Sequence, residues 1–235
     1  MKKLLITTFL VSITVALQAQ TVSGVSSVPL SKADKETGVR IGIRAGLSFA
    51  TLSCSNDDFD SRTTFHAGIT FNIPIVNFGN PSFKQGIDVI TGLSVCGKGM
   101  EYKQEDSGTN VKETVTPLYL QLPMLVSYRF KPCKVMQLQF DFGLYFAYGI
   151  SGKYKIEHRN DKTNESVETD FFGDDNTFQR ADWGLHMGFG VTFVRHFHFG
   201  VAYETGFWSI KHKNLDTGSG DWKNNVWSVS LGYDF

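Results

Sequence analysis

Apolar and polar residues alternate strictly along most of the chain from residue 39 onward. In VRIGIRAGLSFAT, residues 39–51, every second side chain is apolar up to Phe49, and the side chains between them are Arg, Gly, Ser or Ala. A period of two indicates a β-strand with two different faces. The same alternation recurs seven more times, so the pattern predicts eight strands. They cover 39–50, 65–73, 87–98, 118–130, 138–149, 182–193, 197–207 and 227–235.

The second face of these strands distinguishes between two kinds of β-protein. A soluble sandwich or barrel carries many Lys and Glu on its solvated face, whereas here that face is mostly Gly, Ser, Ala and Thr with a few charges of both signs. Bulky apolar residues outside and small or polar residues inside are typical of a transmembrane barrel. Small inward residues suit a narrow barrel, and an even strand number leaves no unpaired edge in lipid. We expect an all-β, eight-stranded, antiparallel up-and-down transmembrane β-barrel.

The connections alternate in length, which predicts an orientation. Long polar connections are expected at 52–61, 103–113, 153–178 and 209–224, with 153–178 the longest, and shorter ones at 75–85, 131–135 and 194–196. Outer-membrane barrels have long extracellular loops and short periplasmic turns. The pattern therefore places both ends of the barrel domain, and the leader before it, in the periplasm.

The N-terminus has the features of a secretory signal peptide. Lys2 and Lys3 precede an uncharged apolar stretch, Leu4 to Leu17, and Ala19 offers a cleavage site. The stretch is short for a spanning helix. We expect a signal peptide at 1–19, a flexible periplasmic leader at 20–38 and the barrel at 39–235.

Composition and charge narrow the function classes. The chain has 20 Phe, 8 Tyr and 4 Trp beside 23 Gly, and loss of the two signal-peptide lysines shifts its net charge from 0 to −2. Aromatic enrichment favours β-structure, and the charge gives no reason to expect a nucleic-acid partner. The three cysteines, Cys54, Cys96 and Cys133, exclude a full disulfide framework; at most Cys54 and Cys96 pair.

Several strand patterns together resemble the PorT-like outer-membrane β-barrel family of Gram-negative bacteria. The matching stretches are GIRAGLSFATL, FHAGITFNIPI, ITGLSVCGKGMEY, LYLQLPMLVSYRF, DFGLYFAYGISG, the Gly-rich residues 182–206, and SVSLGYDF. The resemblance implies an eight-stranded outer-membrane barrel inserted by the barrel-assembly machinery, which reads a C-terminal strand ending in an aromatic residue; Leu231, Tyr233 and Phe235 fit that signal. It brings no catalytic residues. A few members resemble secretion-system components.

The charges on the small-residue face are the main candidate chemistry. They are Arg40, Arg44, Asp88, Lys98, Arg129, Asp141, Asp182 and Glu204. Buried charges are tolerated only when they are paired. The favoured interpretation is an internal salt-bridge network that fills the lumen. The alternative is a gated aqueous path lined by these charges, which the narrow interior of eight strands disfavours.

Three histidines suggest a metal site, but their spacing argues against one. The outward positions of Phe193 and Phe197 predict a three-residue turn, Val194 to His196, with His198 inward beside it. His186 is seven residues from Phe193, about 20 Å away at the rise of a strand. Zinc ligands must converge within about 2.1 Å of the ion, so we expect no metal site, and no cofactor.

The remaining histidines and the acidic loops do not favour catalysis. His158 near Asp161 and His212 near Asp216 are expected to be solvated loop residues, as are Asp57, Asp58, Asp60, Asp174 and Asp175. For these five acidic residues, weak binding of a divalent cation is the alternative. We expect a monomeric, non-enzymatic barrel with a structural or interaction role. Its expected partners are outer-membrane lipid, the barrel-assembly machinery and an unidentified extracellular or secretion-system protein. A small-solute porin, a secretion accessory and a soluble lipocalin-like carrier remain open alternatives.

Overall fold

The strands of the protein form one continuous antiparallel sheet. The computed structural model describes residues 38–53, 61–80, 83–106, 109–160, 163–170, 172, 179–209 and 222–235. All but Gly38 belong to one compact unit, Val39–Phe235. Its strands are β1 (Arg40–Ser53), β2 (Arg62–Asn80), β3 (Phe83–Gly97), β4 (Met100–Asp106), β5 (Thr109–Lys131), β6 (Met136–Asn160), β7 (Thr163–Asp170), β8 (Ala181–Phe193), β9 (Phe197–Gly206) and β10 (Lys223–Asp234). The predicted signal peptide and all but the last residue of the predicted leader lie outside the described residues.

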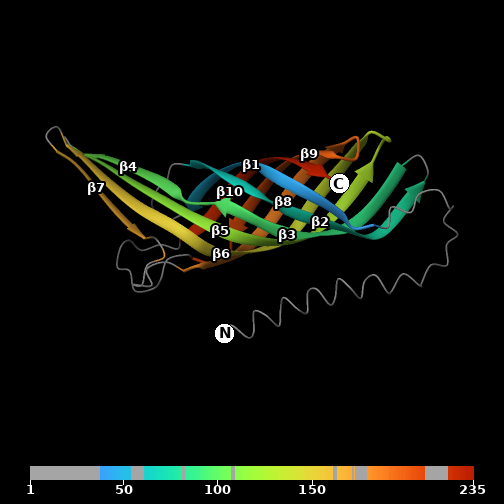
Figure 1. Cartoon of the computed structure of the whole chain (residues 1–235), viewed down its shortest axis with the longest axis horizontal. Helices are drawn as coiled ribbons and strands as arrows, with labels where there is room; N and C mark the ends of the chain where they lie inside the picture. Colours follow the sequence, from blue (N-terminus) through green and yellow to red (C-terminus); the bar gives the residue numbers. More distant parts are fainter. Residues whose placement is uncertain are drawn as a thin grey trace, which may run out of the picture. The chain divides into compact units, whose positions relative to one another are not determined.

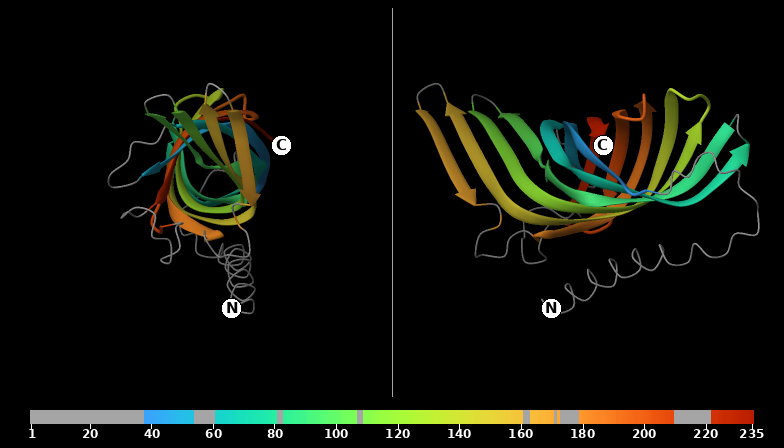
Figure 2. Two further views of the ribbon diagram at one scale, coloured as in Figure 1. Left: turned by 90° about the vertical axis from the view of Figure 1, so that its left-hand side faces the viewer. Right: turned by 45° about the vertical axis from the view of Figure 1, so that its right-hand side comes forward.

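Eight of these strands close into a ring. In the order β1, β2, β3, β5, β6, β8, β9 and β10, each strand pairs with the next, and β10 pairs back to β1. Figure 2, in its left view, shows the strands curving round to enclose a lumen. The predicted eight-stranded antiparallel barrel is confirmed.

The two faces of the ring are inverted relative to a soluble protein, as the alternation predicts. Outward side chains are apolar and exposed, for example Phe142 at 58% and Leu231 at 66%. Inward side chains are polar and buried, such as Ser48 and Asn224. No helix among the described residues is long and apolar enough to cross a membrane.

The short connections lie at one end of the ring, which we call the short-turn end. Phe193 pairs directly with Phe197 across the turn Val194–Arg195–His196, so the predicted three-residue turn is confirmed. Val194 and Arg195 both have positive φ, 50° and 68°, and this left-handed backbone reverses the chain in so few residues. The predicted connection at 75–85 is too long, because β2 continues to Asn80 and β3 begins at Phe83, with a shift in register between Pro74 and Val76.

The predicted long loops at 103–113 and 153–178 are partly wrong, because both contain strands. β4 pairs with the start of β5, and β7 pairs with the end of β6, so the four form a sheet that continues beyond the ring. Figure 1 shows β4 and β7 beside the extended ends of β5 and β6. We call this the long-hairpin end. Most residues of this extension are polar while backbone pairing continues, so the apolar alternation ends before the strands do. Residues 54–60 and 210–221 of the other two predicted loops lie outside the described residues.

A break at Lys98–Gly99 separates β3 from β4, and Lys98 points inward at this break. β3 and β4 pair in succession with the same strand, β5, on either side of Thr116 and Pro117. Proline cannot donate to the ladder, and here its carbonyl accepts from the Lys98 amide at 3.0 Å. Gly99 has φ +123°, and a Cβ there would lie 2.1 Å from the Val115 oxygen. Only glycine fits this position without strain.

Candidate functional site in the barrel lumen

The lumen contains two separate groups of ion pairs. All eight residues predicted to carry lumen charge are buried or half-buried. The structure brings Lys98, Asp182 and Glu204 together toward the long-hairpin end, and Arg40, Asp88 and Arg129 toward the short-turn end. Arg44 instead pairs with Asp234, which the predicted set did not include, and Asp141 forms no ion pair with another described residue.

Lys98 is the centre of the group toward the long-hairpin end. Its Nζ donates to Asp182 Oδ2 at 2.9 Å and lies 3.9 Å from Glu204 Oε2. The same nitrogen lies 4.1 Å from the centre of the Tyr145 ring, a cation–π distance. Asp182 Oδ2 also accepts from Asn224 at 2.9 Å and from Tyr145 at 3.3 Å. The Lys98 and Asp182 side chains are 1% and 0% exposed, so this pair is shielded from water.

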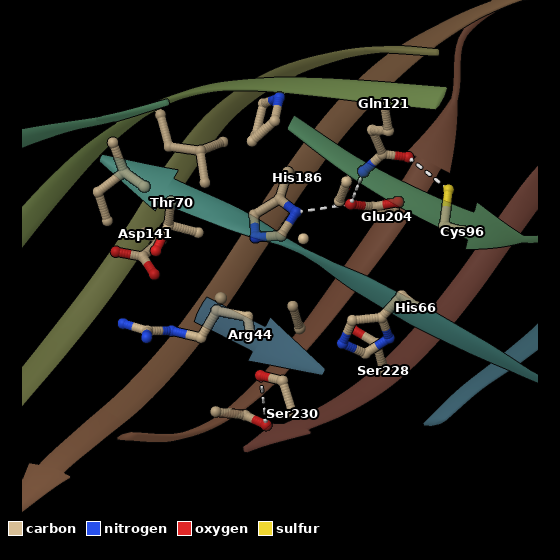
Figure 3. A pocket seen from close by; sticks show the side chains of 18 of the residues that line it. Arg44, His66, Thr70, Cys96, Gln121, Asp141, His186, Glu204, Ser228 and Ser230 are labelled. Carbon is tan, nitrogen blue, oxygen red and sulfur yellow. Dashed lines mark hydrogen bonds and ion pairs between the residues drawn. The ribbon is translucent and has the colours of Figure 1, made fainter. Parts of the chain in front are cut away.

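Glu204 connects this group to the middle of the lumen. Gln121 donates to Glu204 Oε1 at 2.7 Å, and His186 Nδ1 lies 2.8 Å from the same oxygen. Cys96 donates in turn to Gln121 at 3.3 Å. Figure 3 shows this chain of contacts, with His186 pointing toward Glu204 and Gln121 between Glu204 and Cys96. Residues of β3, β5, β8 and β9 are thereby joined across the lumen.

Asp88 is the centre of the group toward the short-turn end. Arg40 and Arg129 each lie 3.1 Å from one of its two carboxylate oxygens. Arg129 also donates to Asn77 at 2.6 Å, and Arg40 reaches across to Gln137 at 3.4 Å. These contacts join β1, β2, β3, β5 and β6. Two guanidinium groups share one carboxylate, so the group carries net positive charge.

A cavity of about 150 Å³, lined by both polar and apolar side chains, lies between the two groups. Asp141 lines it, and its Oδ2 accepts from Gln139 at 2.9 Å. His66 and Ser48 also line it, joined by a 2.9 Å contact between His66 Nδ1 and Ser48 Oγ. Hydroxyl groups of Ser228 and Ser230 complete this wall (Figure 3). A cavity of this size with several polar partners is large enough for a few water molecules.

An apolar layer covers the Lys98 group on the side of the long hairpins. It consists of Cys96, Met100, Val115, Tyr119, Tyr145, Ala147 and Phe172. Phe172 follows β7 and packs edge-on against Tyr119, with ring centres 5.8 Å apart. Arg180 holds it there by donating to the Phe172 carbonyl at 2.6 Å and to the Gly149 carbonyl at 3.3 Å. A Cβ at Gly149 would lie 2.2 Å from the Phe172 ring, so glycine leaves the space that the ring fills.

The three histidines of the metal hypothesis lie in three different environments. His186 contacts Glu204, His198 contacts Thr192 at 3.1 Å, and His196 contacts the Asp234 carbonyl at 2.6 Å. His196 also stacks on Tyr233, at the junction of the last turn and the last strand. The described residues contain no group of three or more His, Cys, Asp or Glu placed to hold a metal ion.

The loop predictions fall mostly outside the described residues. This applies to Asp57, Asp58, Asp60, Asp161, Asp174, Asp175, His212 and Asp216, and to Cys54, which was at most a partner for Cys96. Cys96 itself is buried as a free thiol. His158, expected in a loop, is in β6.

Sequence reasoning missed several polar partners in the lumen. Asp234 alternates with outward Tyr233 and was identifiable as inward by the rule that selected the others. Gln121 and Asn224 are neutral, so a search for charges passes over them. Phe172 lies where the sequence has no alternation, and no local signal marks it as buried.

Comparisons with known proteins were made for the whole chain. Residues 18–212 match the family model described as outer membrane protein beta-barrel domain. A comparison with curated proteins finds no match. Among solved structures, the attachment invasion locus protein Ail of Yersinia pestis is 16% identical over 84% of this chain and 99% of its own, with a TM-score of 0.35. Neisserial surface protein A is 11% identical over 83% and 97%, with a TM-score of 0.34. The outer membrane enzyme PagL is 13% identical over 83% and 98%, with a TM-score of 0.35. At TM-scores this low, the three similarities carry no argument about function.

Proposed function

The chain belongs to the outer membrane protein beta-barrel domain family, and we therefore propose that it is an outer-membrane barrel with a structural or interaction role and no catalytic activity. In this role a closed, rigid barrel holds the long hairpins in fixed positions at the cell surface. The finer similarity to PorT-like barrels of Gram-negative bacteria, and a monomeric state, are part of the same proposal.

The dimensions of the apolar belt support a membrane-spanning barrel. Along β8, outward Trp183 and Phe193 are ten residues apart, which is about 33 Å at the rise of a strand. At a tilt of about 40° this is about 25 Å along the barrel axis, the height of the apolar band of outer-membrane barrels. Aromatic side chains gather at both limits of the belt. Trp183 packs against Phe207 at one end, and Phe197 packs against Tyr233 at the other.

Side-chain hydrogen bonds across the lumen are the main support for a barrel that does not conduct solutes. Lys98–Asp182, Gln121–Glu204 and Arg40–Gln137 each join strands that are not neighbours in the ring. The interior of an eight-stranded barrel is just wide enough for side chains. Bonds that cross it at two levels leave no room for a continuous water-filled path, so the barrel acts through its surfaces.

Residues 1–19 and the last strand are the basis for our proposal on how the protein is exported and inserted. We propose that residues 1–19 are a cleaved signal peptide and that the barrel-assembly machinery recognises the last strand. Leu231 and Phe235 are 66% and 70% exposed on the outer face, where a receptor can contact them. The short-turn end then faces the periplasm and the long-hairpin end the extracellular side.

Cell fractionation combined with a heat-modifiability gel tests this proposal. We expect the protein in the outer membrane, with faster migration of the unboiled sample. Protease added to intact cells should cleave within the hairpin of β6 and β7 and leave the barrel core. Recovery as a detergent-free soluble protein would instead support the lipocalin-like carrier and end the membrane proposal.

A small-solute channel is the second candidate, because the lumen contains the 150 Å³ cavity. Single-channel recordings and liposome swelling separate the two functions. We expect no stable conductance from the wild-type barrel, and a reproducible unit conductance would establish the channel. A secretion-accessory role would appear as copurification with secretion components together with a secretion defect on deletion.

A further inference from the structure

Lys98 and Asp182 meet in a part of the lumen that is shielded from water. Their side chains are 1% and 0% exposed, and Lys98 Nζ lies 2.9 Å from Asp182 Oδ2. The apolar layer that includes Met100, Tyr119 and Phe172 covers them on the side of the long hairpins. In water an ammonium and a carboxylate resist condensation because each ion is strongly solvated. Here folding has already removed that solvation.

Lys98 is the nucleophile of this pair. Once it has given up a proton, its nitrogen has a free electron pair. The other cations of the lumen, Arg40, Arg44 and Arg129, are guanidinium groups, which do not lose a proton in proteins. The bond to Oδ2 holds Nζ beside the carboxyl carbon to which that oxygen is attached. Fixed proximity of two reacting groups is equivalent to a concentration of about 10⁵ M or more.

The Asp182 carboxyl group is placed to be the electrophile. Its Oδ2 accepts from Asn224 at 2.9 Å and from Tyr145 at 3.3 Å. When a nitrogen adds to the carboxyl carbon, negative charge develops on this oxygen, and the two donors stabilise it. The other oxygen, Oδ1, is buried and accepts no hydrogen bond from the described residues. Oδ1 is therefore the oxygen that is free to leave.

Glu204 is placed to carry protons between the two groups. Its Oε2 lies 3.9 Å from Lys98 Nζ, a separation that a small rotation of the lysine side chain closes. Its Oε1 is fixed by Gln121 at 2.7 Å and His186 at 2.8 Å, so the carboxylate keeps its orientation (Figure 3). Lys98 and Glu204 both line the lumen cavity, which gives a released water molecule a place to go.

We propose that Lys98 and Asp182 join in an amide bond, formed by the folded barrel itself with Glu204 as the proton carrier. The Nζ–Cγ bond forms and the Cγ–Oδ1 bond breaks. The ammonium gives up two of its three protons by way of Glu204, and both leave with Oδ1 as one water molecule. A cation and an anion become a neutral amide, and no oxidant, reductant or other reactant takes part. This inference rests on the fold and not on the proposed surface role.

The amide closes a covalent loop around both long hairpins. The segment between the two residues, 99–181, contains β4, β5, β6 and β7. A single cut by an extracellular protease within this segment then leaves the two fragments joined. The bond also ties the start of β8 to the break between β3 and β4, across the lumen. It therefore strengthens the part of the barrel from which the hairpins extend.

The intact mass of the wild-type protein tests the bond. The full-length chain, collected from inclusion bodies in urea and kept reduced, should have the mass of its sequence. After the chain folds in detergent micelles, we expect the mass to fall by that of one water molecule. A tryptic digest should then contain 85–103 and 181–195 as one branched peptide, without cleavage after Lys98. Folded wild-type protein that keeps the mass of its sequence would overturn the proposal.

Two variants test the assigned roles. Lys98→Arg keeps the positive charge and removes the nucleophile. After protease cleavage within the hairpin of β6 and β7 and boiling, the wild-type fragments should stay joined, whereas the Lys98→Arg fragments should separate. Glu204→Gln should slow the loss of water by about a hundredfold or more in protein that is still heat-modifiable. A rate equal to that of the wild type would show that Glu204 is not the proton carrier.

The ion pair of Lys112 with Glu101 is the matched control within the same chain. Its atoms are also 2.9 Å apart, but its side chains are 42% and 22% exposed. Trypsin should therefore still cleave after Lys112. A branched peptide at Lys112 as well would mean that condensation occurs at any ion pair during sample preparation, and the buried site would have no special role.

Heat modifiability of the wild-type sample separates failure of this inference from failure of the barrel proposal. If the chain does not fold in micelles or lipid, the barrel proposal fails. If it folds and keeps its full mass, only the amide proposal fails. Should Lys98→Arg not fold, the intact mass and the branched peptide of the wild type still decide the question, because neither measurement needs a variant.

Discussion

Replacement of Lys98 by methionine is expected to destabilise the barrel strongly, because it leaves buried carboxylates without their cation. Methionine keeps most of the apolar stem but removes the bond to Asp182 Oδ2 and the cation–π contact with Tyr145. Glu204 retains His186 and Gln121, so the cost falls mainly on Asp182. Asp182 retains two neutral donors, Asn224 and Tyr145, and both bind the oxygen that Lys98 leaves.

The expected loss of stability follows from the burial of Asp182 without its cation. Removal of one partner of a buried ion pair costs about 3–5 kcal/mol, since the remaining charge stays in a medium of low polarity. The double variant Lys98→Met with Asp182→Asn removes both charges and should be more stable than Lys98→Met alone, by about 2 kcal/mol. Lys112→Met is the matched control. Its ion pair with Glu101 is 42% and 22% exposed, so the loss should be under about 1 kcal/mol.

Urea titration of the reconstituted barrel, followed by tryptophan fluorescence and heat modifiability, measures these differences. With a denaturant dependence of about 1–3 kcal/mol per molar urea, the Lys98→Met midpoint should fall by at least about 1 M. A loss no larger than that of Lys112→Met would show that the Lys98–Asp182 pair is not shielded from water. If the double variant is less stable than Lys98→Met, the unpaired Asp182 carboxylate is not the cause of the destabilisation.

Three further predictions test the packing of Phe172 against Gly149, the turn at Val194 and the apolar belt. Gly149→Ala should displace Phe172, because the added Cβ would lie 2.2 Å from that ring, and trypsin should then cleave faster at Arg180. Adding Phe172→Ala should remove the steric conflict between the Cβ and the ring. An unchanged cleavage rate in Gly149→Ala would contradict the packing. Val194→Asn should raise the unfolding midpoint, because a β-branched residue at φ 50° is strained by about 1 kcal/mol, and a lower midpoint would show that the turn is unstrained. Phe142→Arg should reduce stability in lipid by about 2–4 kcal/mol, because Phe142 pairs with Met187 midway between the belt limits Trp183 and Phe193. Phe197→Arg, at the edge of the belt, should cost about 0–1 kcal/mol, and equal effects would place both residues at the same depth.

The ring of eight strands could be predicted from the sequence because the membrane imposes a simple rule on it. Each outward position facing lipid must be apolar, and each inward position must fit a narrow polar interior, so alternation encodes both faces. The same rule predicts the turn at Val194, where only three residues keep Phe193 and Phe197 on one face. Beyond Ile150 the strands leave the apolar belt, and the alternation of apolar and polar residues stops. The strands beyond it, such as β7, are held by backbone pairing that leaves little trace in the side-chain pattern.

The lumen could be predicted as a set of inward residues but not as a set of pairs. Alternation places Arg44 and Asp182 on the inner face, yet which residues meet across the barrel depends on the stagger of the strands. Arg44 lies close to Asp234 because β1 and β10 pair with Gly42 opposite Asp234. Alternation places Lys98 on the inner face as well, but its bond to Asp182 across the lumen depends on the height at which each strand places its side chain. The stagger of the strands does not follow from periodicity alone.

The distribution of charge in this barrel follows from the same division between lipid and lumen. A charge cannot be placed on the outer belt, so the chain can carry charge only in the lumen or at the two ends. In the lumen a charge needs a partner: Lys98, Asp88 and Asp234 form ion pairs, and Asp141 accepts a hydrogen bond from the neutral Gln139. The ends have no such constraint. The charged residues in the turns at the short-turn end, such as Lys134 and Arg195, are therefore not required by folding.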